Sequence, residues 1–117
     1  MSTHPYPLWS QAAKPTLLAS RDLETGEWIF PAVAENSPLA SRHETVAIDG
    51  TGVVYSFTVI HPSAKSGLAP YALGYVDFAG PVRIFGRLNG EARPTIGRRY
   101  EARPDEQLGY VFEAVTG

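Results

Sequence analysis

The residues with the greatest chemical potential in this chain are arginines that cluster in one segment. Between residues 81 and 103 the chain carries six arginines and two glutamates, whereas the whole chain of 117 residues has a formal charge of −2. Guanidinium groups bind phosphates and carboxylates through paired hydrogen bonds, so the segment could meet a polyanion or an acidic partner. Ordinary surface arginines on a folded domain are the alternative interpretation. The six are Arg83, Arg87, Arg93, Arg98, Arg99 and Arg103.

Two smaller groups of residues could also contact a ligand. Arg83 and Arg87 flank Phe85 with strand spacing, so the three side chains share one face, which could stack on a nucleotide or simply cover a barrel. His61 opens a loop that also holds Lys65, and such a loop could contact a phosphate or a carbonyl, or be solvated. The candidate residues for contacting a phosphate-bearing ligand or a protein partner are therefore His61, Lys65, Arg83, Phe85, Arg87, Arg98 and Arg99.

The chain lacks the residue patterns of an enzyme that works alone. It contains no cysteine, and its three histidines are not spaced as metal ligands on one helix. Neither a G-x-S-x-G motif nor a phosphate-binding glycine-rich loop follows a predicted strand. The glycine-rich stretch at 49–52 is interpreted as a hairpin turn. We therefore predict no catalytic residue and no bound metal.

Composition places the chain among ordinary globular proteins. Its hydrophobic fraction is 44%, which is typical of a folded domain, and no run approaches the roughly 18 apolar residues that would span a bilayer. The first residues lack the basic and apolar regions of a secretion signal. With no cysteine there can be no disulfide framework. We expect a cytoplasmic protein with no membrane contact.

The pattern of strands and turns predicts an all-β fold. Eleven glycines and ten prolines disfavour long helices. Short β-prone runs recur without helical patterns between them, which favours a small five-stranded OB-fold Greek-key barrel over a sandwich of about seven strands. Most tyrosines and phenylalanines take alternating positions suited to a core, and this, with the acidic net charge, disfavours nucleic-acid binding. The predicted strands are 45–48, 53–60, 71–77, 82–88, 98–103 and 110–115.

A separate N-terminal part precedes the predicted barrel. Residues 5–13 offer an apolar stripe with helical spacing and are predicted to form a short helix. Two β-prone runs at 16–20 and 27–30 flank a turn-rich connection and predict a hairpin. We expect an N-terminal part over 1–42 and an OB-fold barrel over 43–117.

Six runs of residues, which together span most of the chain, carry a resemblance to a known family. The most specific run reads Gly-Val-Val-Tyr-Ser-Phe-Thr-Val-Ile-His at 52–61. In their order and spacing the runs resemble the acyl-CoA-associated OB-fold proteins that carry a rubredoxin-like zinc ribbon before the barrel, known as domain of unknown function 35. The other runs lie at 7–9, 17–21, 26–31, 70–76 and 83–88.

The ribbon is where this chain departs from the family pattern. Members usually carry a C-x-x-C-G knuckle and a second C-x-x-C. Here the first pair of positions holds Asp22 and Thr25, and the second falls within 35–39, where there is no cysteine. A structural zinc ion requires four thiolate or imidazole ligands. We therefore expect a degenerate, metal-free ribbon hairpin. The side chains expected to hold it by packing are Leu18, Trp28 and Phe30.

The resemblance also implies a function. Such proteins are similar to small subunits that assemble with thiolase-like, ketosynthase-like or lipid-transfer-type acyl-CoA enzymes, including aldolases and hydratases, and help to shape the acyl-CoA site while catalysis stays on the larger protein. This implies a non-catalytic accessory subunit of a hetero-oligomer in lipid or polyketide metabolism. Its arginines would meet either the CoA phosphates or acidic residues of the partner. A stand-alone OB-fold binding domain for CoA esters or single-stranded nucleic acid is the alternative.

Overall fold

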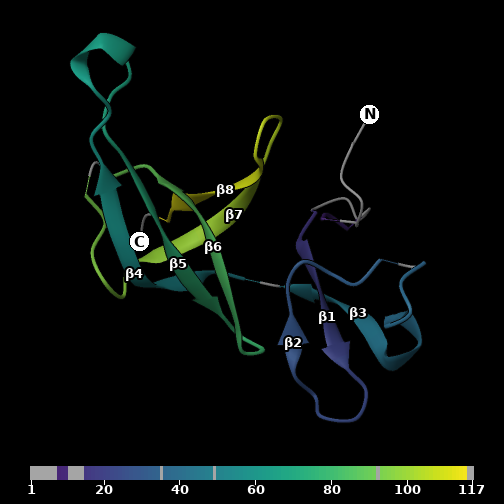
Figure 1. Ribbon diagram of the computed structural model, residues 1–117. Coiled ribbons are helices and arrows are strands. Elements are labelled where there is room, and N and C mark those ends of the chain that lie inside the picture. The colour runs from purple at the N-terminus through teal and green to yellow at the C-terminus, as the bar shows by residue number, and fades with distance from the viewer. Residues whose placement is uncertain (1–7, 11–14, 35, 49, 92, 116–117) are drawn as a thin grey trace. The chain divides into compact units, whose positions relative to one another are not determined.

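The protein is described by a computed structural model that covers residues 8–10, 15–34, 36–48, 50–91 and 93–115 (Figure 1). Nearly all of its regular structure is β, as predicted. The chain divides into two compact units, each of which is described by itself. The first unit comprises residues 1–49 with 79–82, and the second comprises residues 50–78 with 83–117. Within the residues that the structure describes, no helix is long and apolar enough to cross a membrane.

The first unit is built on a three-stranded antiparallel sheet. Strand β1 (Leu17–Asp22) lies in the centre, between the short strand β2 (Trp28–Ile29) and β3 (His43–Ile48). A 3₁₀ helix, η1 (Ala40–Arg42), leads into β3. The hairpin predicted at 16–30 is therefore present, with β3 added to its other edge. The residues buried in this unit are Leu8, Leu17, Ala19, Ser20, Ala32 and Ile48, whereas Leu18, Trp28 and Phe30 are half-buried.

The start of the chain does not match the predicted helix where it is described. Most of residues 5–13 lies outside the described residues. Trp9 forms an antiparallel β-bridge with Leu17, and the Ser10 amide donates a hydrogen bond to the Thr16 carbonyl. The apolar stripe fits either conformation. Strand β2 pairs only with Ser20 and Arg21 of β1, so the earlier part of β1 is left to supply backbone partners for residues 8–10. The helix prediction is wrong for residues 8–10.

The second unit is a closed five-stranded barrel, which confirms the predicted architecture. Its strands are β4 (Gly52–Ile60), β5 (Tyr71–Phe78), β6 (Val82–Asn89), β7 (Arg99–Asp105) and β8 (Gly109–Ala114), in the order β4-β5-β6-β8-β7. β7 pairs antiparallel with both β8 and β4, and the β4 pairing closes the barrel. β6 and β8 run parallel, as a Greek-key crossover requires. The long β4–β5 loop contains the 3₁₀ helix η2 (Ala64–Ser66).

Small and aliphatic side chains, with the three aromatic rings of Phe78, Tyr100 and Phe112, fill the barrel. Gly74 is needed because a Cβ at this position would overlap the Ser56 carbonyl oxygen on β4. The prediction that most aromatic residues lie inside is wrong, because Tyr55, Tyr75 and Phe85 are exposed. The buried residues of the five strands include Val54, Ala72, Val76, Ile84, Leu88, Tyr100, Val111 and Phe112.

A β-bulge explains why the Tyr55 side chain lies on the outside of the barrel. The register between β4 and β5 shifts between Val54 and Ser56, so Tyr55 lacks a directly opposite residue on β5. A bulge inserts one residue into one strand and interrupts the regular alternation of faces. Simple alternation through 53–60 therefore assigns the later residues of β4 to the wrong side.

Strand β3 belongs to the first sheet rather than to the barrel. It pairs with β1 along its whole length, from Leu17 opposite Ile48 to Asp22 opposite His43. The predicted division of domains between residues 42 and 43 stays a prediction, while in the structure the first compact unit runs to residue 49.

Candidate functional site

The outer face of β6 carries three of the predicted site residues side by side. Arg83, Phe85 and Arg87 are all exposed, because the intervening Ile84 points into the barrel. The Arg83 guanidinium donates two hydrogen bonds to the Asp77 carboxylate, at 2.7 and 3.0 Å. It also lies over the Tyr55 ring, 3.5 Å from the centroid. These hydrogen bonds to Asp77 raise the pKa of Arg83 above its usual value, and they hold the guanidinium in place.

The neighbouring strand completes the surface with aromatic rings. Tyr75 on β5 meets Phe85 edge to face, with ring centroids 5.0 Å apart. The Arg87 guanidinium lies 4.6 Å from the centre of the Tyr71 ring. We call the set Tyr55, Tyr71, Tyr75, Arg83, Phe85 and Arg87 the aromatic–arginine face. Alternating cations and rings on one sheet surface can stack against flat groups or pack against a protein.

A groove of about 410 Å³ borders this face. Leu68 of the β4–β5 loop and Leu108 of the β7–β8 turn lie at its edges, and both are exposed. Tyr71, Phe85 and Arg87 contribute to its lining from the strands. The groove is mostly apolar and has a single cation. In OB-folds, the loops after the first and fourth barrel strands and the face of the second and third strands form the usual ligand surface. Those elements are the ones that meet here.

Two other predicted arginines are engaged within the barrel. Arg98 donates hydrogen bonds to the Glu91 carboxylate at 3.1 Å and to the Val115 carbonyl at 2.6 Å. The buried Tyr100 hydroxyl donates to the same Glu91 oxygen at 3.2 Å, and burial followed by the nearby Glu91 charge raises the pKa of Tyr100 to about 12. Arg99 donates to the Thr51 hydroxyl at 3.1 Å. Arg98 and Arg99 therefore fasten segments of the barrel together.

The loop residues predicted as ligand contacts lie apart from the arginine pair. His61 and Lys65 are both exposed in the β4–β5 loop, and Lys65 lies in η2. Among the residues with described positions, neither forms a hydrogen bond or an ion pair with an arginine of β6. They lie in the same loop as Leu68, but unlike Leu68 they do not line the groove. Their role stays a prediction.

Among the described residues, two histidines, His43 and His61, could take part in catalysis, and their contacts can be followed. His43 Nδ1 is hydrogen-bonded to the Leu39 carbonyl oxygen at 2.8 Å, and its Nε2 faces the Asp22 carboxylate at 3.8 Å. Within the described ranges, neither His43 nor His61 is hydrogen-bonded to a serine hydroxyl, as nucleophilic catalysis by a serine would require.

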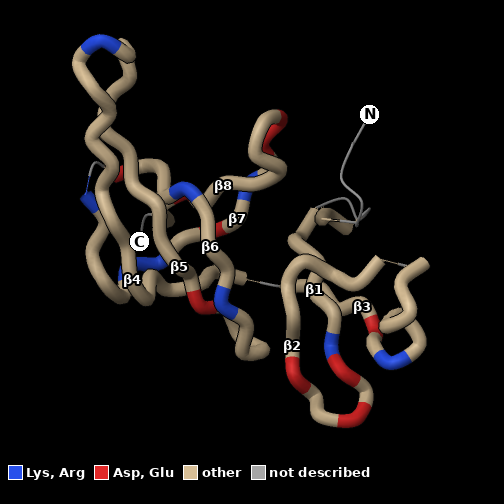
Figure 2. Tube along the Cα trace, viewed as in Figure 1, with Lys and Arg blue, Asp and Glu red and all other residues tan. Residues whose placement is uncertain are grey.

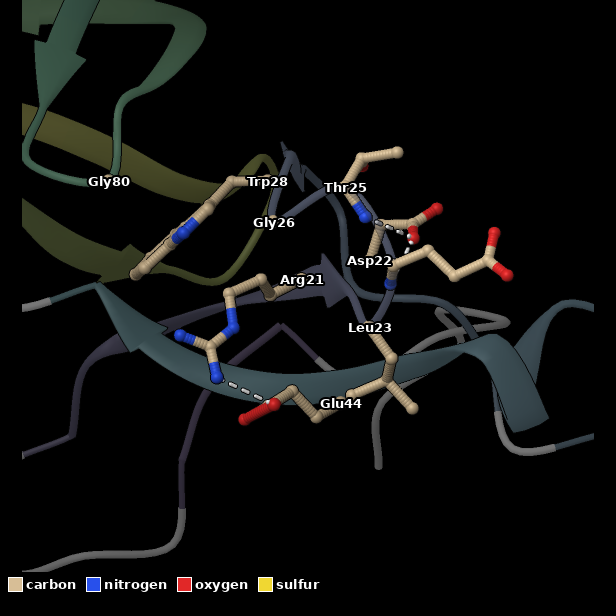
Figure 3. Close-up of a pocket in the computed structure, with 9 residues that line it drawn as sticks. Arg21, Asp22, Leu23, Thr25, Gly26, Trp28, Glu44 and Gly80 are labelled. Carbon is tan, nitrogen blue, oxygen red and sulfur yellow. Dashed lines mark hydrogen bonds and ion pairs between the residues drawn. The ribbon is translucent and has the colours of Figure 1, made fainter.

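The β1–β2 hairpin contains a polar pocket around positions 22 and 25, which the sequence resemblance equates with a first cysteine pair (Figure 3). Asp22 Oδ1 accepts hydrogen bonds from the backbone amides of Glu24 and Thr25, at 2.8 and 3.1 Å. These bonds hold the pKa of the Asp22 carboxyl below its usual value. Arg21 forms an ion pair with Glu44 at 2.7 Å across the sheet. Acidic positions gather along this hairpin in Figure 2.

This donor set does not fit a structural zinc ion. The first cysteine position offers a carboxylate oxygen that already serves two backbone amides, and the second offers Thr25. Over the residues that can be placed, no group of three or more His, Cys, Asp or Glu side chains could hold a metal. A zinc ion requires four ligands, most often thiolates and imidazoles. The hairpin is closed by hydrogen bonds of its own side chains instead.

Sequence reasoning missed the tyrosines of the aromatic–arginine face. The prediction that most tyrosines and phenylalanines suit a core did not single out Tyr55, Tyr71 and Tyr75 as residues of an outer face. The signal that could have placed them outside is the size of their neighbours. Ala72, Gly74 and Val76 alternate with the large residues of β5, and this run of small residues marks the inward face of the strand, where Gly74 lies against the Ser56 carbonyl oxygen.

Comparisons with known proteins agree with this architecture. Residues 45–105 match the family model described as "ChsH2, C-terminal OB-fold domain". A solved structure titled "Ltp2-ChsH2(DUF35) aldolase" contains a chain that is similar over 86% of this chain and 86% of that chain, with 25% sequence identity and a TM-score of 0.64. No curated protein matches the chain.

Proposed function

We propose that this chain, which belongs to the family of ChsH2 C-terminal OB-fold domains, is a non-catalytic accessory subunit of a larger acyl-CoA enzyme. The observation that carries the proposal is its likeness, over 86% of both chains, to a chain of the Ltp2–ChsH2(DUF35) aldolase. A lipid-transfer-type aldolase is the partner that this likeness favours, ahead of the thiolase-like or ketosynthase-like enzymes that the sequence resemblance also implies.

The distribution of chemical groups supports a role without catalysis. The side chains of the aromatic–arginine face are rings and guanidinium groups, which bind and orient, whereas the described histidines have no serine partner. In the proposed complex the catalytic residues lie on the larger subunit, and this chain helps to shape the acyl-CoA site. The zinc-free ribbon and a cytoplasmic setting are part of the same proposal.

Co-expression tests the proposal directly. The full chain, untagged, is produced together with each tagged lipid-transfer-type aldolase or thiolase-like protein of its source organism. We expect one of these proteins to retain the chain through affinity and size-exclusion columns at a fixed ratio, and its aldol-cleavage rate on an acyl-CoA substrate to exceed that of the enzyme alone. Recovery of the chain as a free monomer in every pairing would overturn the proposal.

A stand-alone binding domain is the second candidate, because exposed rings and arginines occupy the customary ligand surface of an OB-fold. Titration with acetyl-CoA and with a labelled single-stranded oligonucleotide, each at two salt concentrations, tests it. Binding that weakens strongly with salt and needs no protein partner would favour this candidate. Absence of binding to both ligands would leave the accessory-subunit proposal as the better one.

A further inference from the structure

The aromatic–arginine face exposes three large aromatic side chains to solvent. Tyr55, Tyr75 and Phe85 are 53%, 43% and 46% exposed. Single exposed apolar residues are common on any surface, whereas contiguous ones mark interaction sites. Here the Tyr75 and Phe85 rings are in contact, and Phe85 also lines the groove together with Leu68 and Leu108. The Tyr75 and Phe85 rings and the groove therefore form one continuous apolar surface.

The arginines of this face are already held in place. Arg83 is fixed by the Asp77 carboxylate and by the ring of Tyr55, and Arg87 lies against the ring of Tyr71. Holding long side chains before binding reduces the conformational entropy that association would cost. Tyrosine and arginine are also the residue types that most often dominate the binding energy of protein interfaces. The face therefore has the residue types of a binding interface, and its arginine side chains are already held in one conformation.

The charge of the face identifies the kind of partner. Asp77 neutralises Arg83, but Arg87 forms no ion pair with any carboxylate in the described part of the chain. A single uncompensated guanidinium beside an apolar groove is complementary to an apolar surface that carries a carboxylate. A phosphate backbone would instead require a row of uncompensated cations. The β7–β8 turn beside Leu108 is acidic, with Asp105 and Glu106, which further disfavours a polyanion.

We propose that the aromatic–arginine face is the surface on which the larger enzyme subunit docks, with an apolar side chain of that subunit in the groove and one of its carboxylates on Arg87. This inference rests on the proposed function, because it takes the partner from there. Of the two alternatives left by the sequence, it assigns these arginines to the partner protein and not to the CoA phosphates.

The test compares variants of the face with matched variants elsewhere on the barrel. Arg87→Glu and Phe85→Ser change the face. Arg103→Glu reverses a charge on β7, and Ile96→Ser removes an apolar side chain that is 58% exposed between β6 and β7. Near-UV circular dichroism establishes that each full-length variant is folded. Affinity for the co-purifying enzyme subunit is then measured by calorimetry.

We expect each face variant to weaken binding at least about tenfold and each matched variant to change it by less than about twofold. Equal binding by all four variants, with the wild-type complex intact, would overturn this inference and leave the proposed function standing. Failure of the wild-type chain to bind any candidate enzyme would overturn both.

Two further results would assign the face to another occupant. If Arg87→Glu abolished binding of acetyl-CoA or of an oligonucleotide while the enzyme subunit still bound, the face would be a ligand site. If light scattering showed a wild-type dimer that Phe85→Ser converts to a monomer, the occupant would be a second copy of this chain. Either result would overturn the proposed docking.

Discussion

Ser20 offers the sharpest test of which contacts hold the first unit together. Its side chain is only 1% exposed, and its Oγ accepts a hydrogen bond of 2.7 Å from the Val33 amide, 13 residues further along the chain. Ser20→Ala removes this acceptor and leaves the Val33 amide without it. An unsatisfied buried donor costs about 1–3 kcal/mol. A small unit of this kind has little stability to lose, so this change is large for it.

Ser37→Ala is the matched control. The Ser37 Oγ also accepts a backbone hydrogen bond, from the Leu39 amide at 3.1 Å, but that bond is exposed to solvent. Water can replace an acceptor lost at the surface, so we expect a cost below about 0.5 kcal/mol. The two variants make the same chemical change in the same unit and differ in burial.

Tryptophan fluorescence isolates the relevant transition. The chain has two tryptophans, Trp9 and Trp28, and both belong to the first unit. With a urea dependence near 1 kcal/mol/M, Ser20→Ala should lower the unfolding midpoint by about 1 M or more, and Ser37→Ala by less than about 0.5 M. Equal midpoints for the two variants would refute the argument that the buried hydrogen bond fastens this unit.

Three further predictions concern titration and metal. Since the pKa of Tyr100 is about 12 in the folded chain and 10 in the unfolded chain, its hydroxyl stabilises the barrel below pH 10, and this contribution is lost as the pH rises from 10 to 12. Tyr100→Phe should therefore flatten the fall of the urea midpoint over that range, and an unchanged slope would contradict the assignment. Because the pKa of Asp22 is lowered, its contribution is present above pH 3.8 and lost as the pH falls. Asp22→Ala should lower the urea midpoint of the first unit at pH 7. Asp22→Asn keeps an acceptor for the Glu24 and Thr25 amides, so its midpoint should stay close to that of the wild type. Elemental analysis should find no stoichiometric zinc and a chelator should leave the Tm unchanged, while one equivalent of tightly bound zinc would contradict a metal-free ribbon.

The barrel could be predicted because its signals are local. The turn residues and the β-prone runs 53–60, 71–77 and 82–88 each lie within a few residues of one another, and their number limits the possible architectures. The pairing of β3 with β1 could not be found in this way. It joins segments separated by the whole ribbon loop, and no pattern in 43–48 distinguishes a strand of the barrel from a strand of the first sheet.

The candidate site was predicted only in part, for a physical reason. Arg83, Phe85 and Arg87 were placed on one outer face because arginine cannot be buried there without a partner. Both faces of β4 carry apolar residues, so hydrophobicity alone does not say which side is inside, and the bulge after Val54 then changes the alternation. Arg98 and Arg99 look equivalent to Arg83 in sequence. Their separate roles arise from contacts with Glu91 and Thr51 that only the folded chain brings near.

In the N-terminal hairpin, hydrogen bonds hold the turn at positions that the sequence resemblance assigns to cysteines. A knuckle needs its backbone amides satisfied and its two loops held together, and a metal is one means to both ends. Here Asp22 satisfies the amides of the first turn. The Leu23 amide donates to the Arg42 carbonyl at 2.9 Å, which ties that turn to the segment before β3. Arg42 adds an ion pair with Glu24 at 3.4 Å, although so exposed a pair contributes little. The backbone bond and the Asp22 turn therefore hold this hairpin to the segment before β3, and because the pKa of Asp22 is lowered, its part of that stabilisation is lost as the pH falls.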